Sequence, residues 1–363
     1  MAGRNRVNLV VLGAGAIGRA LLGQIAARQE ALRGRLGIDL QVGTVATSRL
    51  WRGAGSGPLE GDQLRAIAAT GLEGDLARPY TPYEMRAYLG SLTEPTVVVD
   101  VTAAETGDLL LAALMAGHHV VLANKKPVSG QAAIFAAFMQ YRAEGRVVRY
   151  EATVGAGLPV ISTLQDMVET GDSIVAIDAA LSGTLGYLCT ALQDGAPFSR
   201  AVRAARANGY TEPDPRDDLS GRDVARKAVI LARTCGFEAD LDALPAAGLG
   251  DLGSPGASVE QFMASLEGQD EAMTERVAHA GERGEVLRYV ARVTPEGAST
   301  GLQSLSREHP LASLRGTANL VAITSQRYRE LPLVISGHGA GAAVTAAGVF
   351  GDVLAAARVA RSG

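Results

Sequence analysis

The protein has 363 residues, of which 47% are hydrophobic and 20% are charged, so the chain can bury a core and lacks the composition of a disordered protein. Its 34 basic and 38 acidic residues leave a net charge of −4, which gives no electrostatic reason to expect a nucleic acid or an anionic membrane as a partner. The two cysteines, Cys189 and Cys235, are too few for a disulfide scaffold or a four-cysteine zinc site.

The chain has no sequence feature that directs it out of the cytoplasm. No signal peptide is visible at the N-terminus, and no uncharged apolar stretch is long enough to span a bilayer. We therefore expect a soluble, cytoplasmic protein, and its length predicts two domains.

Short apolar strands alternate with helices over about residues 1–150. The predicted strands are Arg6–Leu12, Leu40–Thr47, Thr96–Thr102, His119–Ala123 and Val147–Tyr150. Between them we predict helices from Leu21, over Gly107–Ala116 and over Phe135–Glu144, and a flexible surface loop over Trp51–Gly61. This alternation indicates the α/β class, with a doubly wound parallel sheet of the Rossmann type.

The pattern changes after residue 150. The remaining predicted elements are helices at Ile161–Val168, over most of 187–236 and at Ala342–Arg361, and strands at Ser173–Leu181, Leu320–Thr324 and Leu333–Ser336. Residues 240–300 carry no motif that we can interpret. The mixture predicts a second, α+β domain.

The first strand runs into Gly13-x-Gly15-x-x-Gly18, and a helix follows. In the dinucleotide-binding fingerprint the first glycine permits a tight turn, the second lets the backbone approach a pyrophosphate, and the third lets helix and strand pack closely. The helix N-terminus, at Ala16 and Ile17, adds partial positive charge near the phosphates. With 44 glycines in the chain such a hexad can arise by chance, but its place in the first strand–helix turn favours a dinucleotide site.

The end of the second strand indicates which dinucleotide binds. NAD sites usually place a carboxylate there to hold the ribose 2′-hydroxyl, whereas this strand ends in Ser48-Arg49 and the nearest acid, Asp39, precedes it. A hydroxyl and a guanidinium suit a 2′-phosphate, so we expect NADP, with NAD possible. The alternative is that Arg49 is an ordinary exposed arginine.

Lysine is scarce: Lys125, Lys126 and Lys227 are the only lysines among the 34 basic residues. Codon composition explains the scarcity but not the positions. Because an arginine stays charged whereas a lysine can exchange a proton, chemistry that needs an amine cannot pass to arginine. Lys125 ends the fourth strand, at the edge of the sheet where ligands bind, while Lys126 is interpreted as a surface charge.

Lys227 lies on a helix that follows an acidic, proline-containing loop, Gly209–Gly221. Asp223 and Lys227 are neighbours one turn apart, beside a predicted core stripe of Val224, Ala228, Leu231 and Cys235. A lysine at such a boundary is partly desolvated, which can lower its pKa toward neutrality. The alternative is structural: Ser220 and Asp223 also match a capping box, and Asp–Lys pairs are common on helix surfaces.

Other reactive residue types are interpreted as structural. His118 and His119 precede the fourth strand, at the edge of the sheet opposite the ligand site. Both cysteines lie in predicted helices, as buried small side chains. No His, Cys and carboxylate set has the spacing of a metal site.

Together these segments resemble the homoserine dehydrogenase family. The resemblance rests on the runs Glu151–Pro159, Leu181–Leu185, Gly209–Gly221 with Asp223–Lys227, His309–Ala312, Gly316–Asn319 and Gly339–Ala346. It extends from the first fingerprint to the last helix, but residues 50–90 and 240–300 match little, and Thr102–Glu105 is a looser match.

The resemblance implies reversible reduction of L-aspartate 4-semialdehyde to L-homoserine with NAD(P)H, in threonine, methionine and isoleucine biosynthesis. It makes Lys227 the proton donor and acceptor, has Asp223 orient it and contact the substrate, and has Glu212 hold the substrate ammonium. Lys125 would contact both cofactor and substrate. Two further cofactor contacts, Thr102 and Gly341, follow from the same resemblance.

The resemblance also implies a monovalent cation, most simply sodium, bound by the carbonyl oxygens of four residues of one loop: Glu151, Val154, Ala156 and Leu158. It implies a homodimer, an NAD(P)-binding domain at 1–150 rejoined by the helix at 341–363, and a catalytic and dimerisation domain at 151–340.

Because the chain starts close to the fingerprint and ends soon after Gly341, we expect a single-function form without a fused kinase or a C-terminal regulatory domain. Two other functions remain open: a dehydrogenase of another small amino or hydroxy acid, and a non-catalytic NADP-binding sensor.

Overall fold

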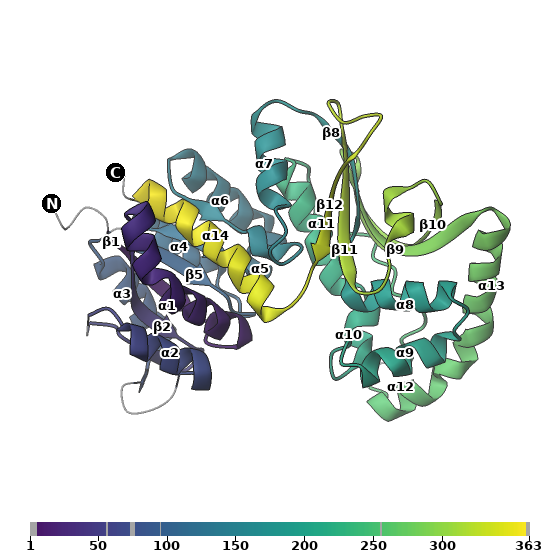
Figure 1. The fold of residues 1–363 in the computed structure, drawn as a ribbon, viewed down its shortest axis with the longest axis horizontal. Coiled ribbons are helices and arrows are strands. Elements are labelled where there is room, and N and C mark those ends of the chain that lie inside the picture. Colours follow the sequence, from purple (N-terminus) through teal and green to yellow (C-terminus); the bar gives the residue numbers. More distant parts are fainter. Residues whose placement is uncertain (1–5, 56, 73–76, 95, 255, 361–363) are drawn as a thin grey trace. The chain divides into compact units, whose positions relative to one another are not determined.

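Figure 1 shows the computed structural model, which describes residues 6–360 except 56, 73–76, 95 and 255. The chain divides into two compact units, one made of residues 1–157 with 340–363 and the other of residues 158–339. Each unit is built around one β-sheet with its own hydrophobic core.

The sheet of the first unit has the strand order β4-β3-β2-β1-β5-β6-β7 over the described residues. Its parallel strands are β1 (Arg6–Leu12), β2 (Asp39–Ala46), β5 (Thr96–Asp100), β6 (His119–Leu122) and β7 (Val148–Arg149). Strands β5 and β6 are buried along their whole length, as expected of apolar strands covered on both faces. The α/β prediction is confirmed, and the five predicted strands lie close to their predicted bounds.

Helices cover both faces of this sheet (Figure 1). On one face α1 (Ala16–Leu36) packs between α2 (Gly61–Thr70) and α14 (Ala342–Ala360). On the other face α4 (Gly107–Met115) packs between α3 (Pro82–Ser91) and α6 (Ala132–Ala143), and the short α5 (Lys126–Ser129) contacts α6.

Helix α14 is long and apolar enough to cross a membrane by length and composition alone. In the structure it instead packs against α1, β5 and β6, and Val349, Val353 and Ala357 belong to the hydrophobic core of the first unit. Its buried Asp352 accepts hydrogen bonds from Arg149 Nε (2.7 Å) and from the backbone N–H of Glu151 (2.9 Å). These contacts make α14 a core helix.

The loop predicted over Trp51–Gly61 is wrong at its start. Leu50–Arg52 forms strand β3, which pairs antiparallel with β2 and with β4 (Arg78–Pro79) and extends the sheet at one edge. Trp51 is buried because its ring stacks on Tyr80, with centroids 5.1 Å apart, and meets the edge of Tyr88 at 5.5 Å. The glycines that follow Trp51 are typical of a loop, and the contacts that make Leu50–Arg52 a strand come from residues about 30 positions away. The local sequence therefore did not predict this strand.

The second unit contains an antiparallel sheet in the order β10-β9-β8-β11-β12 over the described residues. Its strands are β8 (Ile174–Ala180), β9 (Glu285–Thr294), β10 (Gly297–Ser306), β11 (Ala318–Ser325) and β12 (Leu333–His338). The predicted strands of this region are β8, β11 and β12. Residues 240–300 supply most of the long β9–β10 hairpin, which the sequence did not predict.

Helices α8 and α11 pack against this sheet (Figure 1). The helices of the unit are α7 (Ile161–Glu169), α8 (Gly183–Gln193), α9 (Phe198–Ala207), α10 (Pro215–Leu219), α11 (Arg222–Thr234), α12 (Val259–Ser265) and α13 (Asp270–Glu282), with a 3-10 turn, η3 (Pro310–Ser313). The loop predicted over Gly209–Gly221 therefore contains a short helix, α10.

The histidines and cysteines have the structural roles that the sequence indicated. His118 Nε2 bonds to the carbonyl of Leu89 (2.8 Å), and His119 Nδ1 accepts from the N–H of Val147 (3.1 Å). Both cysteines are buried, and burial raises the pKa of Cys189 to about 11 and that of Cys235 to about 12. Neither thiol is a reactive nucleophile.

Candidate functional site

The glycine fingerprint forms a tight turn between β1 and α1. Gly13 has φ = 110°, its N–H donates to the carbonyl of Ala46 (2.7 Å), and a Cβ there would lie 3.0 Å from the backbone of Val101. A Cβ on Gly18 would lie 1.9 Å from the carbonyl oxygen of Gly13. Turn and close packing thus both require glycine.

Gly15 is different, because no protein atom lies within 4 Å of where its Cβ would be and its φ of −76° is ordinary. It is the N-cap of α1, makes no side-chain cap, and is followed by Ala16, which is exposed, and Ile17, which is half-buried. The first turn of α1 also contains no acidic residue. Open space beside uncapped N–H groups suits a phosphate. Packing within the protein therefore does not explain a glycine at position 15, whereas a bound phosphate would.

Ser48 and Arg49 lie at the exposed tip of a turn between β2 and β3. The turn is closed by a hydrogen bond from Thr47 N–H to the carbonyl of Leu50 (2.7 Å), and Thr47 Oγ1 accepts from the N–H of Leu50 (3.0 Å). Tyr80 supports it from the residue after β4, since its hydroxyl donates to the carbonyl of Thr47 (2.5 Å). This turn presents the Arg49 guanidinium on a well-supported backbone.

Lys125 and Thr102 follow the adjacent strands β6 and β5, and both are half-buried. Two buried residues next to them, Asp100 and Asn124, connect the ends of the two strands. The sequence analysis did not identify either as a site residue. Lys126 pairs with Glu105 (3.0 Å), in keeping with its interpretation as a surface charge. Gly341, with φ = 114°, is exposed just before α14.

Lys227 is the most constrained of the predicted catalytic residues. It is only 8% exposed, and its Nζ donates to Asp223 Oδ2 (2.8 Å) and to the carbonyl oxygen of Leu181 (2.6 Å). The Asp223 side chain is 54% exposed, so the pair lies at the boundary between core and solvent. The predicted core stripe beside it is buried at every position: Val224, Ala228, Leu231 and Cys235.

The capping-box interpretation of Ser220 and Asp223 is wrong. The N-cap of α11 is Gly221, in a left-handed conformation with φ = 69°, and no side chain caps the helix. Ser220 Oγ accepts from the N–H of Arg222 (3.3 Å) and donates to the carbonyl of Asp217 (2.8 Å). Asp223 forms an ion pair with Lys227, one turn further along α11.

Glu212 lies exposed on the acidic loop, and Asp218 holds the backbone that carries it. Asp218 Oδ2 accepts from the N–H of Glu212 (2.8 Å), and Asp218 Oδ1 lies 2.9 Å from Thr184 Oγ1. Asp214 has a different role. Its carboxyl group accepts hydrogen bonds from Arg216 in the same loop, and these bonds lower its pKa. The sequence showed the acidic cluster but not this division of roles.

Residues of the previously uninterpreted region support the start of α11. The hydroxyl of Tyr289 on β9 donates to the carbonyl of Ala247 (2.7 Å), and a Cβ on Gly221 would lie 1.8 Å from that hydroxyl oxygen. The N–H of Leu249 donates to the carbonyl of Leu219 (2.8 Å). The segment 245–250 and strand β9 therefore fix where α11 begins.

The loop expected to bind a cation starts at the 3-10 turn Glu151–Thr153. Gly155 (φ = 78°) and Ala156 (φ = 58°) are consecutive left-handed residues, and Ala156 is the only non-glycine residue with positive φ among those described. Among the residues that the structure describes, no group of three or more His, Cys, Asp and Glu side chains could hold a metal ion. Any cation here would depend on carbonyl oxygens.

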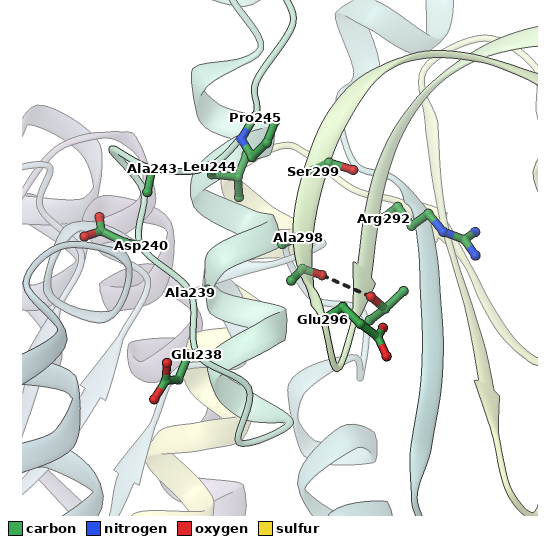
Figure 2. A pocket seen from close by; sticks show the side chains of 12 residues that line it. Glu238, Ala239, Asp240, Ala243, Leu244, Pro245, Arg292, Glu296, Ala298 and Ser299 are labelled. Atoms are coloured by element: carbon green, nitrogen blue, oxygen red, sulfur yellow. Dashed lines mark hydrogen bonds between the residues drawn. The ribbon is translucent and has the colours of Figure 1, made fainter.

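A hollow of about 440 Å³ in the second unit does not include any predicted site residue (Figure 2). In Figure 2 the charged groups of Glu238, Asp240 and Arg292 point away from its middle, where Leu244 and Ala298 lie. Arg292 is bound to Asp178 through both carboxylate oxygens (2.8 and 2.9 Å). The hollow therefore offers no converging polar groups for a ligand among the described residues.

The chain matches two family models over most of its length. Residues 13–151 match the model described as homoserine dehydrogenase, NAD binding domain, and residues 159–354 match the model described as homoserine dehydrogenase. The chain belongs to the homoserine dehydrogenase family. This is a family of NAD(P)-dependent oxidoreductases that act on a CH–OH group of a small molecule, so the resemblance seen in the sequence is confirmed.

Homoserine dehydrogenases align along almost the whole chain. Homoserine dehydrogenase from Saccharomyces cerevisiae is 34% identical, over 96% of this chain and 97% of the yeast protein. Bifunctional aspartokinase/homoserine dehydrogenase 1 from Arabidopsis thaliana is 38% identical over 97% of this chain, which spans 39% of that longer protein. A hyperthermophilic archaeal homoserine dehydrogenase solved in complex with NADPH superposes with a TM-score of 0.73, at 25% identity and 97% coverage of each chain.

We predict that Gly221→Ala displaces the start of α11. A non-glycine residue in the left-handed region costs about 1–2 kcal/mol, and the new Cβ would also overlap the Tyr289 hydroxyl. Thermal unfolding should show a lower midpoint than wild type. Adding Tyr289→Phe removes the overlapping oxygen and should restore part of the loss, whereas a double variant no more stable than Gly221→Ala would contradict this account.

Proposed function

We propose that this chain is a homoserine dehydrogenase that interconverts L-aspartate 4-semialdehyde and L-homoserine with NAD(P)H. The observation that carries the proposal is the buried Lys227 ammonium, held by Asp223 and the Leu181 carbonyl on a helix that belongs to this family's model. Family membership supports the reaction class, and the acidic loop beside α11 supports a substrate that carries an ammonium group.

Lys227 has the chemistry that carbonyl reduction needs. When bound, NAD(P)H supplies the hydride. The aldehyde oxygen then gains negative charge and must receive a proton, which a lysine ammonium can donate and, in the reverse direction, its amine can accept. Asp223 and Leu181 take two of the three ammonium hydrogens, and we assign the third to the substrate oxygen.

Glu212 and Lys125 complete the proposed substrate contacts. The exposed Glu212 carboxylate would bind the substrate ammonium, with its backbone held by Asp218. Lys125, just after the carboxyl end of β6, would contact substrate and cofactor. Thr102 and Gly341 would add contacts to the cofactor.

The proposal is tested by oxidation of L-homoserine by the purified protein, with NADP and NAD compared side by side. L-serine, L-threonine and 2-hydroxybutyrate serve as a panel of related alcohols. Preferred oxidation of one of these would replace the substrate assignment, and nucleotide binding without oxidation of any of them would favour a non-catalytic sensor.

If Lys227 transfers the proton, Lys227→Ala should lower kcat by roughly 10²–10⁴, the usual contribution of a general acid–base group. Lys227→Arg is the sharper variant, because it keeps the charge but a guanidinium does not release its proton near neutral pH. We expect it to fold, to bind NADPH and to be nearly inactive. Lys126→Arg, at a surface ion pair, is the matched control and should retain full activity.

A folded Lys227→Arg protein with wild-type turnover would make the Asp223–Lys227 pair structural. The proton-transfer role would then pass to Lys125, which follows the end of β6.

We propose further that the cofactor is NADP rather than NAD. The support is the Thr47–Leu50 turn, which presents Arg49 and the Ser48 hydroxyl without a nearby carboxylate from β2. A guanidinium at this position suits a dianionic 2′-phosphate. The NADPH found in the archaeal relative is in keeping with this preference.

Arg49→Ala should therefore raise the KM for NADP roughly ten- to a hundred-fold, the range expected for one lost hydrogen bond to a charged group, and leave the KM for NAD nearly unchanged. Steady-state kinetics with both cofactors measures this difference. Arg28→Ala, at an exposed arginine of α1 in the same unit, controls for the loss of surface charge. Equal effects on the KM for both cofactors would show that Arg49 does not bind the 2′-phosphate.

We also propose a sodium ion bound by the carbonyl oxygens of Glu151, Val154, Ala156 and Leu158. Carbonyl oxygens suit a hard cation, and the left-handed turn at Gly155–Ala156 reverses the backbone so that successive carbonyls change direction. The Glu151 and Leu158 carbonyls also accept N–H groups, from Val154 and Val160, and a carbonyl oxygen has two lone pairs, so these bonds do not conflict with a cation.

Sodium chloride should then raise the thermal midpoint and the activity of the protein along a saturating curve, while tetramethylammonium chloride at equal ionic strength should do neither. Identical curves for the two salts would rule out a specific sodium site.

The remaining proposals are a cytoplasmic location and a homodimer built through the second unit. Strand β12 ends its sheet among the described residues, and it exposes Val334 beside the 82% exposed Leu331. We expect light scattering to give twice the chain mass, and Val334→Lys to weaken the dimer by placing a charge on the edge strand. A dimer unaffected by this change would move the interface elsewhere.

A further inference from the structure

We propose that Asp100 is a positioning residue that locks the ends of β5 and β6 together and so places Thr102 and Lys125 for the cofactor. This inference rests on the proposed function for the roles of those two residues. It follows from a buried hydrogen-bond network that lies wholly within the first unit.

The Asp100 carboxylate is completely buried and is surrounded by donors. Its Oδ1 accepts from the N–H (2.9 Å) and the hydroxyl (2.7 Å) of Thr102. Its Oδ2 accepts from the hydroxyl of Thr106 (2.5 Å) and from Asn124 Nδ2 (2.9 Å). No ion pair joins Asp100 to any of the described residues, so these neutral donors alone compensate its burial.

Asn124 carries the same network to the next strand. Besides Asp100, its Nδ2 reaches the carbonyl of Ala104 (2.8 Å), while its Oδ1 accepts from the N–H of Lys126 (3.1 Å). The backbone carbonyl of Asp100 also accepts from the N–H groups of Ala123 (2.9 Å) and Asn124 (3.3 Å). Lys125 is therefore held between two residues that are both tied into the network.

The network adjoins the glycine turn. Val101, directly after Asp100, donates its N–H to the carbonyl of Leu12 (2.9 Å), and its backbone would lie 3.0 Å from a Cβ on Gly13. The ends of β1, β5 and β6 are thus fastened at one edge, where open α/β sheets bind their ligands. Displacement of one of these strand ends would change the distance between the glycine turn and Lys125.

Burial decides which role Asp100 can have. A side chain with no exposed surface does not touch substrate or cofactor, so it can act only through Thr102 and Asn124. A buried carboxylate that accepts from two different loops is also costly to replace, since any neutral group leaves donors unpaired. Asp100 therefore acts on the site by orienting others.

The test replaces Asp100 by asparagine, which keeps the shape but turns one acceptor into a donor that faces other donors. We expect the NADPH dissociation constant, measured by fluorescence titration, to rise roughly ten-fold or more, the size of effect known for residues that orient metal ligands. The acetylation rate of Lys125 should also change. Because the chain has only three lysines, mass spectrometry resolves each rate, and Lys227 in the second unit should keep its wild-type rate.

Asp172→Asn is the matched control. Asp172 is also buried and accepts from the Ser325 hydroxyl (2.7 Å) and the N–H of Arg327 (3.2 Å), but it belongs to the second unit. Its loss should lower stability without altering NADPH affinity or the Lys125 rate. A double variant that exchanges the two residues, Asp100→Asn with Asn124→Asp, again places an amide donor opposite a carboxylate acceptor. It should recover part of the NADPH affinity that Asp100→Asn loses.

A folded Asp100→Asn protein with wild-type NADPH affinity and an unchanged Lys125 rate would overturn the proposal. If that variant does not fold, Thr106→Val replaces it, because it removes one donor to Asp100 and leaves the carboxylate in place. It should shift the NADPH affinity and the Lys125 acetylation rate in the same directions as expected for Asp100→Asn. No shift in either would overturn the proposal. Neither readout requires turnover, so a protein that binds NADPH but does not oxidise homoserine would contradict the proposed function and leave this inference standing.

Discussion

An ammonium group that is almost fully buried must be paired, because an isolated charge in a protein interior is strongly unfavourable. Lys227 meets this requirement with a carboxylate from its own helix and a carbonyl at the end of β8. The second bond ties α11 to the sheet of the second unit at the residue for which we propose proton transfer. The arrangement around α11 serves to keep this geometry.

Segments far away in the sequence maintain the position of α11. Tyr289 and Gly221 fit so closely that a larger residue at 221 cannot be accommodated without movement. Leu249 fixes the carbonyl of Leu219, and Asp218 fixes the N–H of Glu212. The region 240–300, which looked uninformative, thus supports the helix that carries Lys227 and the end of the acidic loop.

Local patterns were predictable, and long-range hydrogen bonds were not. The glycine turn, the core stripe of α11 and the Asp223–Lys227 pair depend on residues within a few positions of each other, so their spacing revealed them. Ser220 matched a capping box by spacing, but the left-handed Gly221 starts the helix differently. Asp100 and Asp218 could not be recognised, because their importance comes from partners on other elements rather than from a motif.

The loop from Glu151 to Gly157 shows how one pattern can have two causes. A Cβ on Gly157 would lie 2.7 Å from the carbonyl of Val344, and one on Gly348 would lie 2.8 Å from the carbonyl of Ala156. Helix α14 therefore packs backbone to backbone against this loop, and Asp352 holds its first N–H. Since packing alone requires glycine at 157, that glycine is no argument for a cation. The sodium proposal depends instead on the left-handed turn at Gly155–Ala156, which changes the direction of successive carbonyls.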